Sequence, residues 1–258
     1  MNALIETLES WIDYRDDVTA SGLSIGFVPT MGALHEGHLE LIRKARQETD
    51  CVVVSVFLNP TQFNDPKDYE QYPKTLDRDR ELAADAGADV VLAPSKDVLY
   101  PDGYNYKICE SHLSSFMEGE HRPGHFDGVL TIVMKLFNLV KPDRAYFGEK
   151  DFQQLKLIEG MVEAFFLKTK VVAVPTVRES DGLAMSSRNA LLTEEGRKRA
   201  PVFHQNLTAQ KTADEAREAL TKEGINVEYV EDYEDRRLGA VVIDNVRLID
   251  NVAIKNSI

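Results

Sequence analysis

Two histidines that lie three residues apart, His35 and His38, are the residues whose types and spacing most clearly suggest chemistry. They belong to the segment 31–38, which also contains Gly32 and Gly37. Glycines let an anion approach the backbone closely, and the free N–H groups at a helix N-terminus attract negative charge. Imidazoles on the first turn of a helix can donate hydrogen bonds to phosphate oxygens. The segment therefore predicts a phosphate-binding site.

Two other interpretations of the histidine pair stay open at this point. His-x-x-His is also a spacing of metal ligands, although no cluster of Cys, Asp or Glu completes a coordination shell in the sequence. The pair could also be two ordinary surface histidines, but neither alternative explains the flanking glycines. The segment stands between an apolar run, residues 25–28, and an amphipathic run, residues 39–46. Nucleotide-binding α/β proteins hold phosphate at such a turn between strand and helix, which favours the first interpretation.

A second candidate segment follows the apolar run at residues 51–58. Gln62 offers two donors and an acceptor to a small ligand that carries hydroxyl or carboxylate groups, and Phe63 could form an apolar wall beside it. The alternative is a turn held by Asn59 and Pro60, in which Gln62 is merely solvated.

A third candidate is the segment 148–151, between an apolar run and a predicted helix. Lys150 is a flexible point charge suited to phosphate, and Asp151 could cap the helix or orient a hydroxyl group. Gln153 and Gln154 follow on the first turn of that helix. The alternative is a helix cap with an ordinary surface ion pair.

The fourth candidate, residues 185–188, combines two hydroxyl groups with a guanidinium. Ser186, Ser187 and Arg188 together form a cradle for a polyphosphate that gains charge as a bond breaks. The alternative is a capping serine with a surface arginine. It loses weight because the loop lies between two expected domains, where a lid would close.

Arg122 and the other histidines carry weaker signals. Arg122 could reach an anionic substrate or pyrophosphate, whereas His125, three residues later, is equally expected to be structural. No motif surrounds His112, His121 or His204, and we assign them no role.

The elements that must position these residues follow from alternating apolar patterns. Strands are predicted at residues 25–28, 51–58, 89–93, 144–147 and 170–174, and helices at residues 39–49, 76–86, 128–140 and 152–166. This alternation predicts an α/β fold with a Rossmann-type, doubly wound parallel sheet. The candidate segments follow the strands, so they converge at one edge of the sheet.

The pattern changes after Pro175. A loop at 177–189 and a charged, helix-rich stretch at 193–221 are followed by two short β-like runs, 227–230 and 240–249. We therefore expect two domains, a Rossmann-type domain over residues 1–176 and a smaller C-terminal α+β lid domain over residues 177–258.

Composition limits the class of protein. The net charge of −13 over 258 residues argues against a nucleic-acid surface, which needs a basic stripe. The two cysteines, Cys51 and Cys109, form no disulfide framework, which fits a reducing cytoplasm. No apolar run approaches the ~20 residues of a membrane span, and the first ten residues lack the features of a signal peptide.

Several of these segments together resemble a known family. They resemble the pantoate–β-alanine ligase family, the pantothenate synthetases, and the match extends over most of the chain. Residues 31–38 are similar to the H-I-G-H signature of class I aminoacyl-tRNA synthetases and related nucleotidyltransferases, and residues 185–188 to their K-M-S-K-S loop. The segments that carry the resemblance are residues 27–38, 59–63, 148–154 and 174–189.

The resemblance implies a Rossmann-type N-terminal domain, a C-terminal lid domain and a homodimer. It implies that ATP and pantoate give pantoyl adenylate and pyrophosphate, after which the amine of β-alanine attacks the acyl carbon to give pantothenate and AMP. Mg²⁺ accompanies the ATP, and its ligands stay undefined. The alternatives are a nucleotidyltransferase of the same superfamily that acts on a phosphorylated acceptor, and a regulatory nucleotide-binding domain. Intact His38, Lys150 and Arg188 argue against the regulatory domain.

The resemblance also assigns roles to residues. His38 would be the proton donor or charge stabiliser in adenylate formation, with His35, Lys150 and Arg188 completing the catalytic set. Gln62 and Gln154 would hold pantoate, and Gln62 would also contact β-alanine. Asn59, Tyr72 and Arg122 would lie behind these residues or around the phosphates. The ATP site would comprise Met31, Gly32, Ala33, Leu34, His35, Glu36, Gly37, His38, Gly148, Glu149, Lys150, Asp151, Val177 (through its backbone), Met185, Ser186, Ser187 and Arg188.

Overall fold

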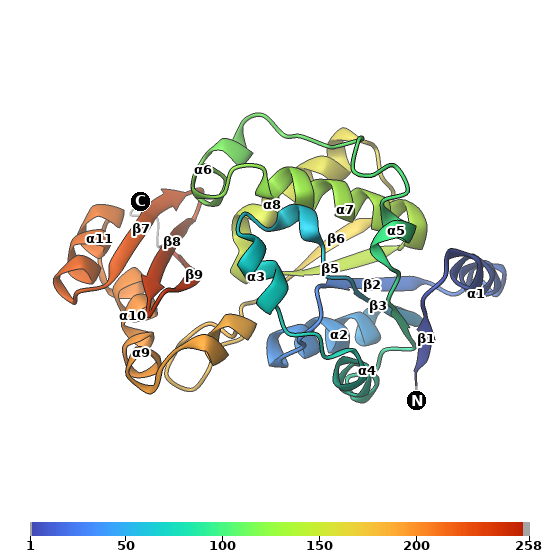
Figure 1. The fold of residues 1–258 in the computed structure, drawn as a ribbon, viewed down its shortest axis with the longest axis horizontal. Coiled ribbons are helices and arrows are strands. Elements are labelled where there is room, and N and C mark those ends of the chain that lie inside the picture. The colour runs from blue at the N-terminus through green and yellow to red at the C-terminus, as the bar shows by residue number, and fades with distance from the viewer. Residues whose placement is uncertain (1, 255–258) are drawn as a thin grey trace.

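A six-stranded parallel sheet forms the larger part of the molecule in a computed structural model, which describes residues 2–254 (Figure 1). Its strand order is β1-β4-β3-β2-β5-β6. The five predicted strands are all present, so the predicted fold class is confirmed. The strands are β1 (Ala3–Ile5), β2 (Ile25–Thr30), β3 (Cys51–Val56), β4 (Val90–Leu92), β5 (Arg144–Gly148) and β6 (Lys170–Val174).

Side chains of each inner strand alternate between the two faces of this sheet, and both faces are covered. Phe27 and Val53 pack with the core beneath α1 (Leu8–Ala20), α7 (His125–Val140) and α8 (Phe152–Ala164). Val28 and Val54 pack beneath α2 (Glu36–Glu48) and α4 (Leu76–Asp85). Figure 1 shows α7 and α8 on one side of the sheet and α2 and α4 on the other. Burial on both faces explains why the strands appear in the sequence as continuous apolar runs.

The helices that cover the parallel sheet agree with the predicted crossovers. The predicted helices at 39–49, 76–86, 128–140 and 152–166 correspond to α2, α4, α7 and α8. The helices before β6 are α1 (Leu8–Ala20), α2 (Glu36–Glu48), α3 (Pro66–Gln71), α4 (Leu76–Asp85), α5 (Lys96–Leu99), α6 (Glu118–His121), α7 (His125–Val140) and α8 (Phe152–Ala164). Short 3₁₀ turns are η1 (Pro60–Gln62), η2 (Leu113–Ser115) and η3 (Glu149–Asp151).

The N-terminal elements β1 and α1 are absent from the sequence prediction. Strand β1 has three residues and pairs with β4 at the sheet edge, which is too short for a periodic pattern. Trp11 on α1 is fully buried, and its indole N–H donates to the carbonyl oxygen of Leu139 at 2.9 Å. Arg15 on α1 donates to the same carbonyl oxygen at 3.0 Å, so two side chains join α1 to the end of α7.

After β6 the chain forms a smaller α+β unit. The 3₁₀ turn η4 (Ser187–Leu191) and the helices α9 (Glu194–Arg199), α10 (Pro201–Ala209) and α11 (Ala213–Lys222) precede a three-stranded antiparallel sheet. Its strands are β7 (Asn226–Tyr233), β8 (Arg236–Ile243) and β9 (Val246–Ala253). Helices α10 and α11 cover one face through residues such as Phe203 and Leu220, while Tyr229 and Leu238 on the other face join the core of the parallel-sheet part.

The sequence predicted two β-like runs in this region, but the structure has three strands. The predicted run at 240–249 spans the end of β8, a turn and the start of β9. Asp244 and Asn245 both have positive φ, as a two-residue hairpin turn requires. The Asp-Asn pair inside an apolar run was the signal for this turn.

No helix within residues 2–254 is long and apolar enough to cross a membrane.

Candidate active site

Two adjoining cavities open where β2, β3, β5 and β6 end. The Gln62 cavity lies toward α7, and the His35 cavity lies toward α2 and the loop after β6, each with a volume of about 190 Å³. Residues that line both cavities are Pro29, Met31, His38, Tyr72, Phe147, Asp151, Gln154 and Arg188.

The two histidines form the N-terminal cap of α2. His35 is the N-cap residue, and its Nδ1 accepts the backbone N–H of Gly37 at 3.1 Å. His38 accepts the backbone N–H of His35 on its own Nδ1 at 3.3 Å. The ring centroids are 4.0 Å apart. Because Nδ1 accepts in both rings, this hydrogen-bond network assigns the ring proton to Nε2 in each neutral histidine.

Both imidazoles are kept neutral by their surroundings. Burial and the nearby ammonium of Lys150 lower the pKa of His35 to about 4. Burial, His35 and Lys150 lower the pKa of His38 to about 3. At neutral pH the pair therefore provides N–H donors without positive charge, so the cations that line the His35 cavity are Lys150 and Arg188.

The turn before the histidines is held by a buried carboxylate that sequence reasoning missed. Asp79 on α4 accepts the backbone N–H groups of Ala33 at 3.0 Å and Leu34 at 2.7 Å. Gly32 has a φ of +83°, and a Cβ there would lie 3.0 Å from the Asp79 carboxylate. A glycine is therefore required where the turn passes this carboxylate. No local pattern marks Asp79, because its partners lie about 45 residues earlier.

Most of the predicted ATP-site residues line the His35 cavity, but five do not. Gly32, Ala33 and Leu34 form the turn behind it, Glu36 is exposed and pairs with Arg43, and Glu149 pairs with Arg236 at 2.6 Å. The predicted residues that line this cavity are Met31, His35, Gly37, His38, Gly148, Lys150, Asp151, Val177, Met185, Ser186, Ser187 and Arg188.

Gln62 lines the Gln62 cavity from a turn that hydrogen bonds of Asn59 stabilise. Asn59 accepts the N–H of Thr61, and its amide donates to the side-chain oxygen of Gln62 at 3.1 Å and to the carbonyl oxygen of Gly128 at 3.2 Å. The turn suggested by Asn59 is thus present, but it directs Gln62 into the cavity. A Cβ on Gly128 would lie 2.4 Å from the carbonyl oxygen of Thr61. Helix α7 and the turn are therefore in backbone contact.

His125 and Arg122 support the same turn from behind. His125 Nδ1 lies 2.8 Å from the carbonyl oxygen of Gln62, and Arg122 donates to that oxygen at 3.3 Å. Burial and the Arg122 charge lower the pKa of His125 to about 4. Both residues also line the Gln62 cavity, so the structural interpretation of His125 agrees with its contacts.

The apolar wall of the Gln62 cavity comes from residues other than the predicted Phe63. Phe63 packs outside against Tyr69 and Tyr72, at centroid distances of 5.6 and 5.9 Å. The spacing of the α7 residues is the ordinary spacing of a core-facing helix, so the sequence gives no signal that they face a cavity. The wall consists of Phe57, Phe147, Val129, Ile132, Val133 and Leu136.

The Ser186–Arg188 segment borders the His35 cavity from the opposite side. Ser186 caps η4 by accepting the backbone N–H of Arg188. Arg178 pairs with Ala184 in an isolated bridge, and Met185 donates its N–H to the carbonyl oxygen of Val177 at 3.0 Å. This hairpin brings the serines, Arg188 and Lys150 into one cavity although they come from separate segments.

Within residues 2–254, no group of three His, Cys, Asp or Glu side chains is arranged to hold a metal ion. Asp151 is the one carboxylate among the residues that line both cavities. A cation bound mainly by phosphate and water needs only one or two protein carboxylates, and Asp151 fits that requirement.

Comparison with known proteins agrees with this geometry. Residues 3–253 match the family model for pantoate-beta-alanine ligase. A pantothenate synthetase of Bdellovibrio bacteriovorus is 57% identical over 231 residues, which cover 90% of this chain and 92% of the relative. A pantoate-beta-alanine ligase of Francisella tularensis, solved with β-γ ATP and β-alanine, superimposes with a TM-score of 0.92 at 39% identity, covering 98% of each chain.

A second solved structure, a pantothenate synthetase from Thermus thermophilus, superimposes with a TM-score of 0.89 at 41% identity, covering 97% of this chain and 99% of that one. Both the family model and these relatives extend across the parallel-sheet part and the C-terminal unit. The chain therefore belongs to the pantoate-beta-alanine ligase family and is a ligase of pantothenate synthesis.

Proposed function

We propose that the two cavities hold the two substrates of the first half of this ligase reaction, with pantoate in the Gln62 cavity and ATP in the His35 cavity. The observation that supports this assignment is the set of shared lining residues. His38, Gln154 and Arg188 stand where the cavities meet, so a carboxylate in one cavity faces the α-phosphate of a nucleotide in the other.

In the first step, the pantoate carboxylate attacks the α-phosphorus of ATP. An acyl–phosphate bond forms and the bond to the β-phosphate breaks, which releases pyrophosphate. The carboxylate is ionised at neutral pH and needs no general base. The Nε2–H groups of His35 and His38 donate to phosphate oxygens, and Lys150, Arg188, Ser186 and Ser187 stabilise the departing charge. A pKa of about 3 makes His38 a neutral charge stabiliser rather than an imidazolium proton donor.

Gln62 and Gln154 hold pantoate through its polar groups, and the apolar wall from α7 and Phe57 contacts its methyl groups. Position at the cavity junction lets Gln154 orient the carboxylate toward ATP. In the second step, the free amine of β-alanine attacks the acyl carbon beside Gln62. The amide bond forms as the acyl–phosphate bond breaks, so AMP leaves and the nitrogen releases one proton.

The backbone of Val177, which lines the far part of the His35 cavity, is the proposed contact of adenine. Gly148 and Met185 border the same space. Mg²⁺, bound by the phosphates and Asp151, would neutralise charge on the polyphosphate.

We further propose residues 1–176 and 177–258 as the nucleotide-binding and lid domains, of which residues 1 and 255–258 lie outside the described part. We also infer a homodimer, as the family resemblance implies, and a cytoplasmic location, which the two unpaired cysteines Cys51 and Cys109 support. Sedimentation of the purified protein tests the dimer, since a monomer at micromolar concentration would contradict it.

An assay with ATP, pantoate and β-alanine tests the reaction. We expect pyrophosphate release only when pantoate is present, and AMP only after β-alanine is added. Pyrophosphate release without pantoate would contradict the ligase assignment, and transfer to a phosphorylated acceptor would favour the nucleotidyltransferase.

A further inference from the structure

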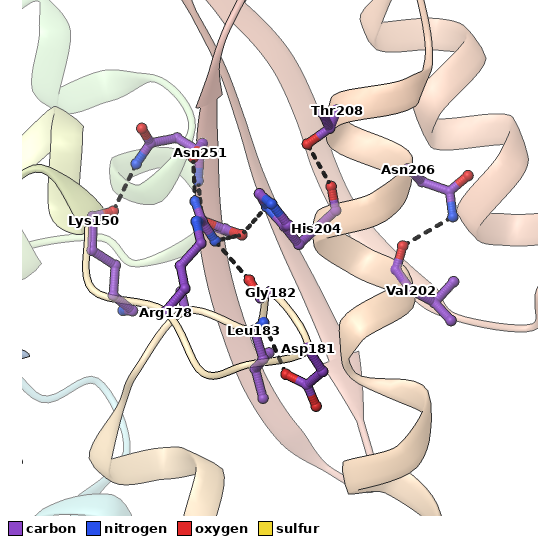
Figure 2. Close-up of polar contacts among 12 residues, drawn as sticks. Lys150, Arg178, Asp181, Gly182, Leu183, Val202, His204, Asn206, Thr208 and Asn251 are labelled. Atoms are coloured by element: carbon purple, nitrogen blue, oxygen red, sulfur yellow. Dashed lines mark hydrogen bonds and ion pairs between the residues drawn. The ribbon is translucent and has the colours of Figure 1, made fainter. Parts of the chain in front are cut away.

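Strand β9 of the C-terminal unit contacts the backbone of the Lys150 segment through one buried amide. Asn251 is 2% exposed, and its Nδ2 donates to the carbonyl oxygens of Glu149 at 2.8 Å and Lys150 at 3.0 Å. Figure 2 shows this amide against the Lys150 backbone, with the lysine side chain extending away from it. Two carbonyl groups of η3 thus depend on a residue about 100 positions later in the chain.

The orientation of this amide is fixed by its oxygen. Arg236 donates to Asn251 Oδ1 at 3.0 Å and pairs with the Glu149 carboxylate at 2.6 Å. The amide can therefore not turn over without placing its N–H groups against a guanidinium. No side chain caps the start of η3, because its N-cap residue is Gly148.

Asp250, the residue before Asn251, holds the loop of residues 177–188, the serine loop, in a similar way. Asp250, 4% exposed, pairs with both terminal guanidinium nitrogens of Arg178 at 2.7 and 2.9 Å and lies 3.1 Å from His204 Nδ1. Burial opposes ionisation, but the His204 and Arg178 contacts lower the pKa of Asp250. Arg178 is bridged to Ala184, immediately before the 185–188 segment.

We propose that Asn251 is a positioning residue for adenylate formation that acts through Lys150, and that Asp250 holds the serine loop in the same way. Neither side chain lines the Gln62 or His35 cavity, so neither touches the substrates there. Two successive residues of one strand thus set the distance between the two phosphate-facing segments. The inference depends on the proposed role of Lys150 in adenylation.

The test measures pantoate-dependent pyrophosphate release for Asn251→Ala, Lys150→Ala and the double variant. We expect Asn251→Ala to lower kcat about tenfold and to leave the KM for β-alanine unchanged, because only the phosphate side is displaced. If Asn251 acts through Lys150, the double variant will be within about twofold of Lys150→Ala. Residues that act independently would multiply their losses.

The matched control is Asn206→Ala. Asn206 also donates its amide to one backbone carbonyl, that of Val202, within α10 of the same unit (Figure 2). We expect near wild-type kcat for it. Asn251→Asp keeps the size and the Arg236 contact but removes both donors, so it reports on the same bonds if the alanine variant unfolds early in a thermal melt.

The outcomes separate this inference from the proposed function. If Lys150→Ala retains full activity, the proposed role of Lys150 is wrong. If Lys150→Ala is impaired while Asn251→Ala and Asn251→Asp match Asn206→Ala, or if the losses multiply, the positioning role of Asn251 is overturned.

Discussion

The two walls of the proposed phosphate site are held in different ways. The histidine wall, residues 31–38, is fixed by hydrogen bonds from backbone N–H groups to imidazole nitrogens and to the buried carboxylate of Asp79. The serine wall, residues 177–188, is fixed by ion pairs, including Arg178 with Asp250 and the partly exposed Arg197 with Asp181 at 2.6 Å. One wall belongs to the parallel sheet alone, and the other depends on β9.

This difference indicates which part of the site is the more rigid. Buried hydrogen bonds within the parallel-sheet part give a preorganised donor pair that needs no rearrangement. Ion pairs between separate elements keep their geometry only while those elements stay together, and the exposed ones add little stability. We therefore expect the histidine wall to contribute most of the transition-state stabilisation, and the serine wall to respond to the position of the C-terminal unit.

The largest expected effect is on the histidine wall. His38→Ala should lower pantoate-dependent pyrophosphate release about 100-fold or more, because a preorganised N–H donor is lost. Ser187→Ala, in the opposite wall, should lose about tenfold, as expected for a hydroxyl donor beside charged partners. Steady-state rates and a thermal melt of each variant check this, and equal losses would remove the distinction between the walls.

The second prediction concerns stability. Asp79→Ala should reduce the free energy of unfolding by about 2 kcal/mol, because the N–H groups of Ala33 and Leu34 lose their acceptor. Asp181→Ala, which removes a partly exposed partner of Arg197, should cost about 0.5 kcal/mol or less. Urea unfolding of the two variants measures the difference. A similar cost for both would mean that the walls are equally anchored.

The third prediction tests whether pantoate binding in the Gln62 cavity is separate from ATP binding between the two walls. Gln62→Ala should raise the KM for pantoate about tenfold through the loss of hydrogen bonds to the ligand. The affinity for ATP should survive, because Gln62 does not line the His35 cavity. Titration with a nonhydrolysable ATP analogue supplies the comparison, and weakened nucleotide binding would count against the assignment of two cavities.

The smallest expected effect is that of mild acid on the histidine wall. With pKa values of about 4 and 3, His35 and His38 should stay in the neutral Nε2–H form from pH 7.5 down to pH 6. Nitrogen-15 chemical shifts of the two rings should not move over this range. A titration near the ordinary histidine pKa of 6.5 would contradict the assigned tautomers.

The same pKa values determine in which direction the free energy of unfolding changes with pH. The unfolded chain binds protons at these histidines below about pH 6.5, whereas the native protein binds none until about pH 4. Since the unfolded state holds more protons in this window, the free energy of unfolding should fall as the pH falls from 6.5 toward 4. A His38→Asn variant should show a shallower fall.

Local patterns predicted what lies close together in the sequence. Continuous apolar runs identified β2 to β6, and the glycine–histidine segment was correctly placed at the start of α2. The resemblance to the ligase family is confirmed. Strand β1 was too short to show a period, and the Asp-Asn turn between β8 and β9 was overlooked.

The contacts that hold the site could not be predicted in this way. Asp79 is 46 residues from Ala33, and Asn251 is 101 residues from Lys150. Each is an ordinary polar residue in its own segment, and its significance arises only when the sheet brings distant loops together. The α7 wall is hidden for a different reason, because a helix face toward a cavity has the same apolar spacing as one toward the core.

Gly128 limits how the Gln62 cavity, the proposed pantoate site, can be redesigned. Because its Cα is in contact with the backbone of the Gln62 turn, helix α7 cannot be moved closer, and any side chain at this position would push the turn away. A pocket for a bulkier acid therefore has to be made by trimming Val133 or Leu136, further along the same helix. In a library randomised over α7, position 128 should return glycine while its apolar neighbours vary.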